Sequence, residues 1–162
     1  MITHTSGNIL EDDADALVNP VNCVGVMGRG LAAQFKSAFP TNFESYKRAA
    51  DRNRIRIGIN HVHALPPDHD RFIINFPTKR HWKYPSHPYY IKLGLHDLRM
   101  TIPGLDIQSI AIPPLGCGLG GLDWSEIRPL IESELDDLPI DIRLYGSPPA
   151  ASAGGHSPPL GE

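Results

Sequence analysis

The sequence predicts an α/β fold with a mostly parallel central sheet. Short β-branched runs alternate with helix-like segments along the chain, and this alternation is typical of α/β proteins. Two glycine-rich turns each follow a short apolar strand and lead into a plausible helix start. Because crossovers of this kind join parallel strands, we expect most strands to pair in parallel.

Six strands are expected, at residues 2–6, 16–19, 60–65, 71–75, 109–112 and 141–145, because these runs are β-branched and bounded by turn residues. A helix over 31–39 is closed by Pro40, and Thr41 with Glu44 at capping-box spacing predicts a second helix to about Asp51. A third helix spans 89–100. Ser86 and Pro88 mark its start and 102–104 its end, and a fourth helix spans 125–135.

Length and composition predict one globular domain at residues 1–146. The chain has 162 residues and a net charge of -3, and residues 147–162 form a Pro/Gly/Ser/Ala-rich tail that we expect to be disordered. No apolar run is long enough to cross a bilayer, and the N-terminus lacks the pattern of a signal peptide. We therefore expect a cytoplasmic protein without membrane contact.

Cysteine and histidine usage favours neither disulfides nor a metal. Cys23 and Cys117 each lie inside a glycine turn and are interpreted as reduced thiols, since no partner base for a catalytic cysteine is evident. His61 and His63 share one face of a strand, but no Cys, Asp or Glu cluster stands beside them at ligand spacing. The acidic residues 11–13 are interpreted as a solvated turn.

The two glycine turns indicate a phosphate or diphosphate ligand. Their sequences are ALVNPVNCVGVMGRGLAAQF at 16–35 and SIAIPPLGCGLGGLDW at 109–124. Glycine allows main-chain N–H groups to converge on an anion, and helix starts, the second marked by Asp123 and Glu126, add further N–H groups. Neither turn has P-loop or GxGxxG spacing. The alternative is that the glycines only make tight strand-to-helix connections.

Cations and aromatic residues are interleaved in the segment 75–90, NFPTKRHWKYPSHPYY. This mixture suits phosphate contacts combined with stacking on unpaired bases. The chain as a whole is acidic, which argues against non-specific duplex binding. A solvated loop whose aromatics cover the core is the alternative. The candidate nucleic-acid contacts are Arg80, His81, Trp82, Lys83 and Tyr84.

Four motifs together resemble the macrodomain, the ADP-ribose-binding α/β/α module, over residues 1–145. They are SGNI at 6–9, ALVNPVN at 16–22, VGVMGRGLA at 24–32 and IPPLGCGLGG at 112–121. INFPTKRHW at 74–82 with the second glycine turn is most similar to bacterial DNA ADP-ribosyl glycohydrolases, antitoxins to a thymidine-modifying toxin, and to the terminal ADP-ribose protein glycohydrolase. The resemblance implies a three-layer α/β/α fold with a mixed, mostly parallel sheet.

The resemblance also implies a binding site. Asn8 and Ile9 would lie near the adenine, where many macrodomains carry aspartate in place of Asn8. Asn22 would face the distal ribose, and the glycine turns would hold the diphosphate from both sides. The implied ADP-ribose site comprises Asn8, Ile9, Asn19, Asn22, Gly25, Val26, Met27, Gly28, Gly30, Thr78, Pro114, Gly116, Cys117, Gly118, Leu119, Gly120 and Gly121.

Lys79 matches the lysine that such glycohydrolases use near the anomeric carbon. A desolvated lysine can attack a ring-opened aldehyde as an amine, or stabilise a departing anion as a cation. The terminal ADP-ribose protein glycohydrolase carries an aspartate in the second glycine loop, where this sequence has Gly120. The resemblance therefore implies a site that has the catalytic lysine, as Lys79, but lacks this aspartate.

The sequence thus predicts a mono-ADP-ribosyl hydrolase that needs no cofactor and acts as a monomer. Its expected substrates are thymidine-linked ADP-ribose on single-stranded DNA and acidic-residue-linked ADP-ribose on protein. A cognate ADP-ribosyltransferase toxin is a potential partner. Two alternatives stay open: a non-catalytic ADP-ribose reader, against which Lys79 argues, and an O-acetyl-ADP-ribose deacetylase, which would not need the loop at 80–84.

Overall fold

Six strands form one mixed sheet in a computed structural model that describes residues 1–146. The strand order is β1-β6-β5-β2-β4-β3, with β3 antiparallel to β4 and the other pairs parallel. The predicted tail at 147–162 lies outside the described residues. The strands are β1 Ile2–Thr5, β2 Ala16–Asn22, β3 His61–Ala64, β4 Phe72–Lys79, β5 Ser109–Ile112 and β6 Asp141–Tyr145.

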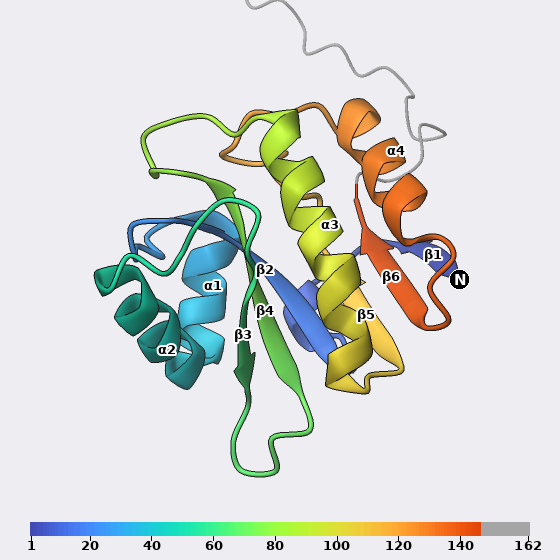
Figure 1. Ribbon diagram of the computed structural model, residues 1–162, viewed down its shortest axis with the longest axis horizontal. Coiled ribbons are helices and arrows are strands. Elements are labelled where there is room, and N and C mark those ends of the chain that lie inside the picture. The colour runs from blue at the N-terminus through green and yellow to red at the C-terminus, as the bar shows by residue number, and fades with distance from the viewer. Residues whose placement is uncertain (147–162) are drawn as a thin grey trace, which may run out of the picture.

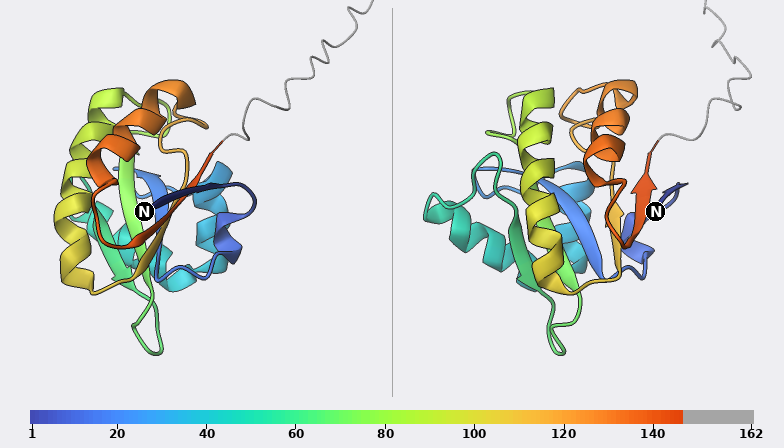
Figure 2. Two further views of the ribbon diagram at one scale, coloured as in Figure 1. Left: turned by 90° about the vertical axis from the view of Figure 1, so that its right-hand side faces the viewer. Right: turned by 45° about the vertical axis from the view of Figure 1, so that its right-hand side comes forward.

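Helices cover both faces of the sheet, which confirms the predicted three-layer α/β/α arrangement. On one face lie α3 and α4, and on the other lie α1, α2 and a short 3-10 helix, η1 (Figures 1 and 2). None of the helices among residues 1–146 combines the length and apolar character needed to span a bilayer. The helices are η1 Ile9–Glu11, α1 Gly30–Ala38, α2 Pro40–Asp51, α3 Pro88–Leu105 and α4 Trp124–Leu135.

The sheet opens where β2 and β5 separate. These strands pair only at Ala16 with Ile110 and Leu17 with Ala111. The predicted ends of β2 at residue 19 and of β4 at residue 75 are both too early, because β2 continues through Pro20 to Asn22 and pairs there with a β4 strand that continues to Lys79. A proline is tolerated there because the β5 side of β2 has no partner at that level. After β2 the chain continues to α1 on one face of the sheet, and after β5 it continues to α4 on the other face. These diverging connections open a crevice at the carboxyl ends of β2 and β5.

The start of α2 differs from its predicted capping box. Phe39 is the N-cap residue without a side-chain hydrogen bond, and Pro40 occupies the first turn, where its fixed φ favours a helix. Thr41 Oγ1 lies 3.1 Å from Nε2 of His63 instead. His61 Nε2 likewise lies 2.9 Å from Ser45 Oγ. The two histidines of β3 therefore bond to hydroxyl groups of α2.

The predicted end of α3 is also wrong, because the helix runs through Pro103 to Leu105. Ile102 in this last part is only 3% exposed and packs in the main core. Burial of an isoleucine side chain contributes about 2 kcal/mol, which offsets much of the cost of a proline inside a helix. Tertiary packing therefore outweighs the local helix-ending signal.

Asp12 contradicts the interpretation of residues 11–13 as a solvated turn. Its side chain is only 5% exposed and lies 2.6 Å from Nη1 of Arg143. The Tyr145 hydroxyl and the Ala14 main-chain N–H also donate to this carboxylate. Burial raises the pKa of Asp12, but these three donors outweigh it and hold the pKa below its usual value. Asp12 thus joins the segment before β2 to β6.

Candidate functional site

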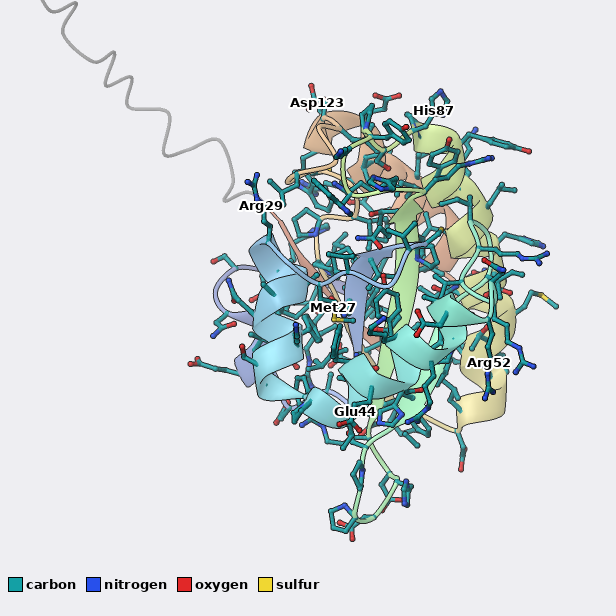
Figure 3. All side chains as sticks on the ribbon, turned by 90° about the vertical axis from the view of Figure 1, so that its left-hand side faces the viewer. Met27, Arg29, Glu44, Arg52, His87 and Asp123 are labelled. Carbon is teal, nitrogen blue, oxygen red and sulfur yellow. The ribbon has the colours of Figure 1, made fainter. Side chains whose placement is uncertain are left out.

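A cavity of about 770 Å³ lies at the carboxyl end of β2, between the two glycine loops. Arg29 at the start of α1 and Asp123 at the start of α4 lie at this end of the molecule, together with His87 (Figure 3). The lining residues are Pro20, Val21, Asn22, Val26, Gly28, Arg29, Gly30, Leu31, Ala32, Thr78, Lys79, Trp82, Pro113, Pro114, Gly116, Gly118, Leu119 and Gly120.

Asn22 fixes the first glycine loop. Its side-chain oxygen accepts from the main-chain N–H of Val24 at 3.0 Å, and its amide nitrogen donates to the Val26 carbonyl at 2.8 Å. The hydroxyl of buried Tyr46 lies 2.7 Å from the main-chain oxygen of Asn22. Gly25 has a φ of +82°, which favours glycine, and a Cβ there would lie 3.1 Å from Ala50. The loop is therefore held in shape without a ligand.

The second glycine loop closes tightly on itself. A Cβ on Gly120 would lie 2.5 Å from the main-chain oxygen of Gly116. The Gly116 oxygen accepts from Leu122 N–H at 2.9 Å, and the Gly120 oxygen accepts from Ser86 N–H at 2.9 Å. Because the atoms opposing the Cβ belong to the main chain, this position admits no aspartate without a backbone shift. This loop conformation therefore requires glycine at position 120.

Both loops present main-chain N–H groups suited to an anion. The first N–H groups of a helix have no intrahelical acceptor, and the α1 N-cap Arg29 supplies no side-chain acceptor to them. Within residues 1–146, the N–H groups of Gly118, Leu119 and Gly120 donate no hydrogen bond to the protein. Free N–H groups from two sides of one cavity, one set at a helix N-terminus, are the arrangement that binds phosphate oxygens.

A bulge at the end of β4 places Lys79 in this cavity. Val21 pairs with Pro77 but Asn22 pairs with Lys79, so Thr78 is the extra residue in β4. Bulges redirect side chains next to functional sites. The Lys79 Nζ donates to the main-chain oxygen of Trp82 at 3.2 Å, and burial lowers the pKa of Lys79. A partly desolvated ammonium group therefore faces the space between the loops.

A second cavity of about 360 Å³ adjoins the first, since both are lined by Leu31, Pro113 and Pro114. Asn8 and Ile9 line the second cavity. Asn8 is the N-cap residue of η1, and its side-chain oxygen accepts from Leu10 N–H at 3.1 Å. The remaining lining residues are Gly7, Gln34 and Tyr145. The two cavities form a cleft that runs from Asn8 to Lys79.

Most of the predicted site residues line this cleft, but five do not. Asn19 is fully buried, and its amide nitrogen donates to Asn75 Oδ1 at 3.1 Å. Met27 is 3% exposed and packs beside Tyr46. Gly25, Cys117 and Gly121 belong to the two loops without lining either cavity. Of the five predicted nucleic-acid contacts only Trp82 lines the cleft, while Arg80, His81, Lys83 and Tyr84 flank Trp82 in the loop after β4 without lining either cavity.

Sequence reasoning missed part of the lining. Arg29 lies within the first glycine motif and could have been found as the only cation there. Leu31 and Ala32 belong to the first turn of a predicted helix that faces the expected ligand. Gln34 and Tyr145 carry no local signal, because they are separated from Asn8 in sequence and meet it only in the fold.

The two cysteines are free thiols that are poorly suited to nucleophilic catalysis. Burial raises the pKa of the Cys117 thiol to about 11 and also raises the pKa of Cys23. The reactive form of a cysteine is the thiolate. Both side chains are therefore protonated at neutral pH.

The fold and the cleft define an α/β/α module with an elongated cleft between two glycine loops. The Macro domain family model matches residues 18–131, and the chain belongs to this family.

Three relatives illustrate the similarity. A curated DNA ADP-ribosyl glycohydrolase of Thermus aquaticus is 46% identical over 147 residues, which cover 90% of this chain and 41% of that protein. The structure of the macrodomain of Mycobacterium tuberculosis DarG is 46% identical with a TM-score of 0.88, covering 91% of this chain and 99% of that one. The structure of Thermosipho africanus DarTG in complex with ADP-ribose is 34% identical with a TM-score of 0.83, and the match covers 89% of this chain and 41% of that one.

The chain spans less than half the length of the first curated relatives it matches, at 41% to 44%. A fusion protein of Thermosipho africanus named DNA ADP-ribosyl transferase-DNA ADP-ribosyl glycohydrolase is 33% identical over 86% of this chain and 40% of its own length.

Proposed function

We propose that this protein is an ADP-ribosyl hydrolase that releases ADP-ribose from thymidine-linked adducts on DNA, with Lys79 as its catalytic residue. The observation that carries the proposal is that the Lys79 ammonium group shares one cavity with two loops of free N–H groups. The names of the relatives that are 46% identical support this activity and substrate.

ADP-ribose would lie along the cleft, with its diphosphate between the glycine loops. The adenine would occupy the smaller cavity beside Asn8 and Ile9, and the distal ribose would lie beside Lys79. The relative solved with ADP-ribose, at a TM-score of 0.83, supports this ligand. The carboxyl ends of parallel strands are where α/β sheets bind such ligands.

Bond cleavage would use Lys79 as a cation. As the bond between the anomeric carbon and the thymine nitrogen breaks, its electron pair goes to the base, and the ribose gains oxocarbenium character. An ammonium group near the base oxygens stabilises that developing negative charge. A water molecule then adds to the anomeric carbon and gives up a proton, while the base takes up a proton.

The proposal is tested by following release of free ADP-ribose from thymidine-ADP-ribosylated single-stranded DNA and from glutamate-ADP-ribosylated protein. Loss of one electrostatic group costs about 100- to 1,000-fold in rate, so Lys79→Ala should lower release by that amount. Lys92→Ala, which removes an exposed lysine of α3 outside both cavities, is the matched control and should match the wild type.

The possible outcomes separate the candidate functions. Release from DNA that depends on Lys79 supports the proposal. Release only from the modified protein would change the substrate to the acidic linkage. Binding of ADP-ribose without release from either substrate would overturn the proposal in favour of a reader. Turnover of O-acetyl-ADP-ribose alone would make the protein a deacetylase.

The fusion relative also supports a transferase as a partner of this protein. A protein that carries both activities in one chain joins the step that forms the linkage to the step that breaks it. A transferase that modifies thymidine would supply the substrate proposed here. When both proteins act on the same DNA, less ADP-ribose should remain on it than with the transferase alone, and this effect should be lost with Lys79→Ala.

A further inference from the structure

The loop after β4 places an indole ring beside the proposed reaction centre. Trp82 lines the larger cavity together with Lys79, and its side chain remains 50% exposed. The main-chain oxygen of Trp82 accepts from the Lys79 Nζ at 3.2 Å. A group bonded to a sugar beside Lys79 would therefore emerge next to the indole ring.

Hydrogen bonds hold this loop in shape without a ligand. The main-chain N–H of Tyr84 donates to the His81 oxygen at 3.0 Å, and the N–H of Lys83 donates to His81 Nδ1 at 3.1 Å. The Cys23 N–H donates to the Arg80 oxygen at 3.3 Å, which ties the loop to the first glycine loop. A surface ordered in advance loses less conformational entropy when it binds.

The aromatic side chains of the loop form one cluster. The His81 ring centroid lies 5.2 Å from that of Trp82 and 5.4 Å from that of Tyr84. Both Trp82 and Tyr84 are exposed, at 50% and 63%, although their apolar area would normally favour burial. An ordered, exposed aromatic cluster at a cavity mouth suits stacking on a flat ligand.

The charges around the cavity suit an anionic substrate. Within residues 1–146, no carboxylate lies within 4.0 Å of the cationic groups of Arg29, Lys79, Arg80 or Lys83. Lys83 lies 5.1 Å from the Trp82 ring, and Arg80 lies 5.6 Å from the Tyr90 ring. These cations belong to a chain of net charge -3, so their positive charge is local and available to phosphates.

We infer that Trp82 forms a nucleobase-binding subsite, on which the thymine carrying ADP-ribose stacks while Arg80 and Lys83 contact the flanking phosphates. The inference rests on the proposed function and names the unpaired DNA strand as the form of its substrate. In a duplex both faces of the thymine are covered by neighbouring bases, so the base must leave the stack to meet the indole. The subsite therefore selects single-stranded over double-stranded DNA.

The test compares three substrates with the same ADP-ribose: a thymidine-modified single strand, the same strand in a duplex, and a glutamate-modified peptide. Removing one stacking residue costs about 5-fold or more per base. Trp82→Ala should thus lower the ratio of kcat/KM for the single strand to kcat/KM for the peptide by about 5-fold or more. The substitution keeps the main-chain oxygen that accepts from Lys79, so this contact is not removed.

Two further variants test whether the aromatic ring at position 82 causes the change in this ratio. Trp82→Phe retains an aromatic face and should recover most of the lost ratio. Tyr89→Ala removes an aromatic residue of α3 that is 58% exposed and lines neither cavity, and it should leave the ratio at the wild-type value. The wild type should cleave the single strand faster than the duplex.

The outcomes for the inference and for the proposed function are distinct. If the wild type releases ADP-ribose from DNA but Trp82→Ala leaves the ratio unchanged, the base subsite is overturned and the hydrolase stands. Equal rates on duplex and single strand also overturn it. If the wild type releases nothing from either DNA, the proposed function itself fails. If Trp82→Ala lowers kcat/KM more on the peptide than on DNA, the base subsite is overturned and the aromatic cluster is assigned to protein substrates.

Discussion

The Lys79 ammonium nitrogen lies 3.2 Å from the main-chain oxygen of Trp82. The bond joins the last residue of β4 to the loop that follows it. Because the acceptor is a main-chain atom, it holds the lysine without neutralising its charge. The lysine is thus held at the cavity, and the loop sequence beyond it can vary without removing the acceptor.

The first prediction concerns the pH dependence of hydrolysis. Burial lowers the pKa of Lys79, so the group loses its proton at a lower pH than a free lysine, whose pKa is about 10.4. If the cation acts on the leaving base, kcat on DNA falls as the pH rises through the lowered pKa. Lys79→Arg, whose guanidinium stays charged, should keep part of the activity and lose this alkaline fall. A kcat that rises with pH, with an inactive Lys79→Arg, would indicate attack by the amine instead.

The second prediction concerns the second glycine loop. Gly120→Ala places a Cβ 2.5 Å from the main-chain oxygen of Gly116, which forces the loop to shift. A loss of about 1 to 2 kcal/mol in ADP-ribose binding is expected from two or so misplaced N–H donors, which calorimetry measures as roughly a 10-fold weaker Kd. Gly104→Ala in α3, where the Cβ meets open space, should bind like the wild type. Unchanged affinity for Gly120→Ala would show that the loop adapts.

The third prediction concerns Asn8 in the smaller cavity. Asn8→Asp keeps the N-cap of η1, since aspartate caps equally well, and supplies a charged acceptor for the adenine amino group. Charge-assisted hydrogen bonds are about twice as strong as neutral ones, so ADP-ribose should bind about 5-fold more tightly. Ribose 5-phosphate, which lacks adenine, should bind both proteins equally. A gain for both ligands would place the effect away from the adenine.

The fourth prediction concerns stability through Asp12. The pKa of this carboxyl is lower in the folded protein than in the unfolded chain. Asp12 therefore stabilises the fold fully above about pH 4, which is near its pKa in the unfolded chain, and this stabilisation is lost as the pH falls through its pKa in the folded protein. Asp12→Asn should lower the free energy of unfolding at pH 7 by about 2 kcal/mol, and the difference should shrink at acid pH. Urea unfolding from pH 7 to pH 3 measures both.

Asp13→Asn is the matched control for Asp12. Asp13 contacts the same Arg143, but its side chain is 91% exposed. Exposed ion pairs contribute about 0 to 1 kcal/mol, so this variant should unfold close to the wild-type midpoint. Equal losses for both variants would show that burial does not set the contribution of Asp12.

The sequence by itself determined the α/β class, the central part of each strand and of each α-helix, the two glycine loops, and Lys79 as the candidate catalytic residue. These features are local: β-branched runs favour strands, and glycine in series leaves N–H groups accessible. The capping of α4 was likewise local, since Asp123 accepts from Ser125 N–H at 3.0 Å as its position predicts.

Only the tertiary structure decided how these parts meet. The separation of β2 from β5, the bulge that turns Lys79 toward the cavity, and the contact of Gly120 with Gly116 depend on pairing between distant segments. Asp12 looked like a solvated residue until Arg143 and Tyr145, more than a hundred positions away, were placed beside it. Such contacts leave no local pattern, because the energy of burial and pairing belongs to neighbours in space and not in sequence.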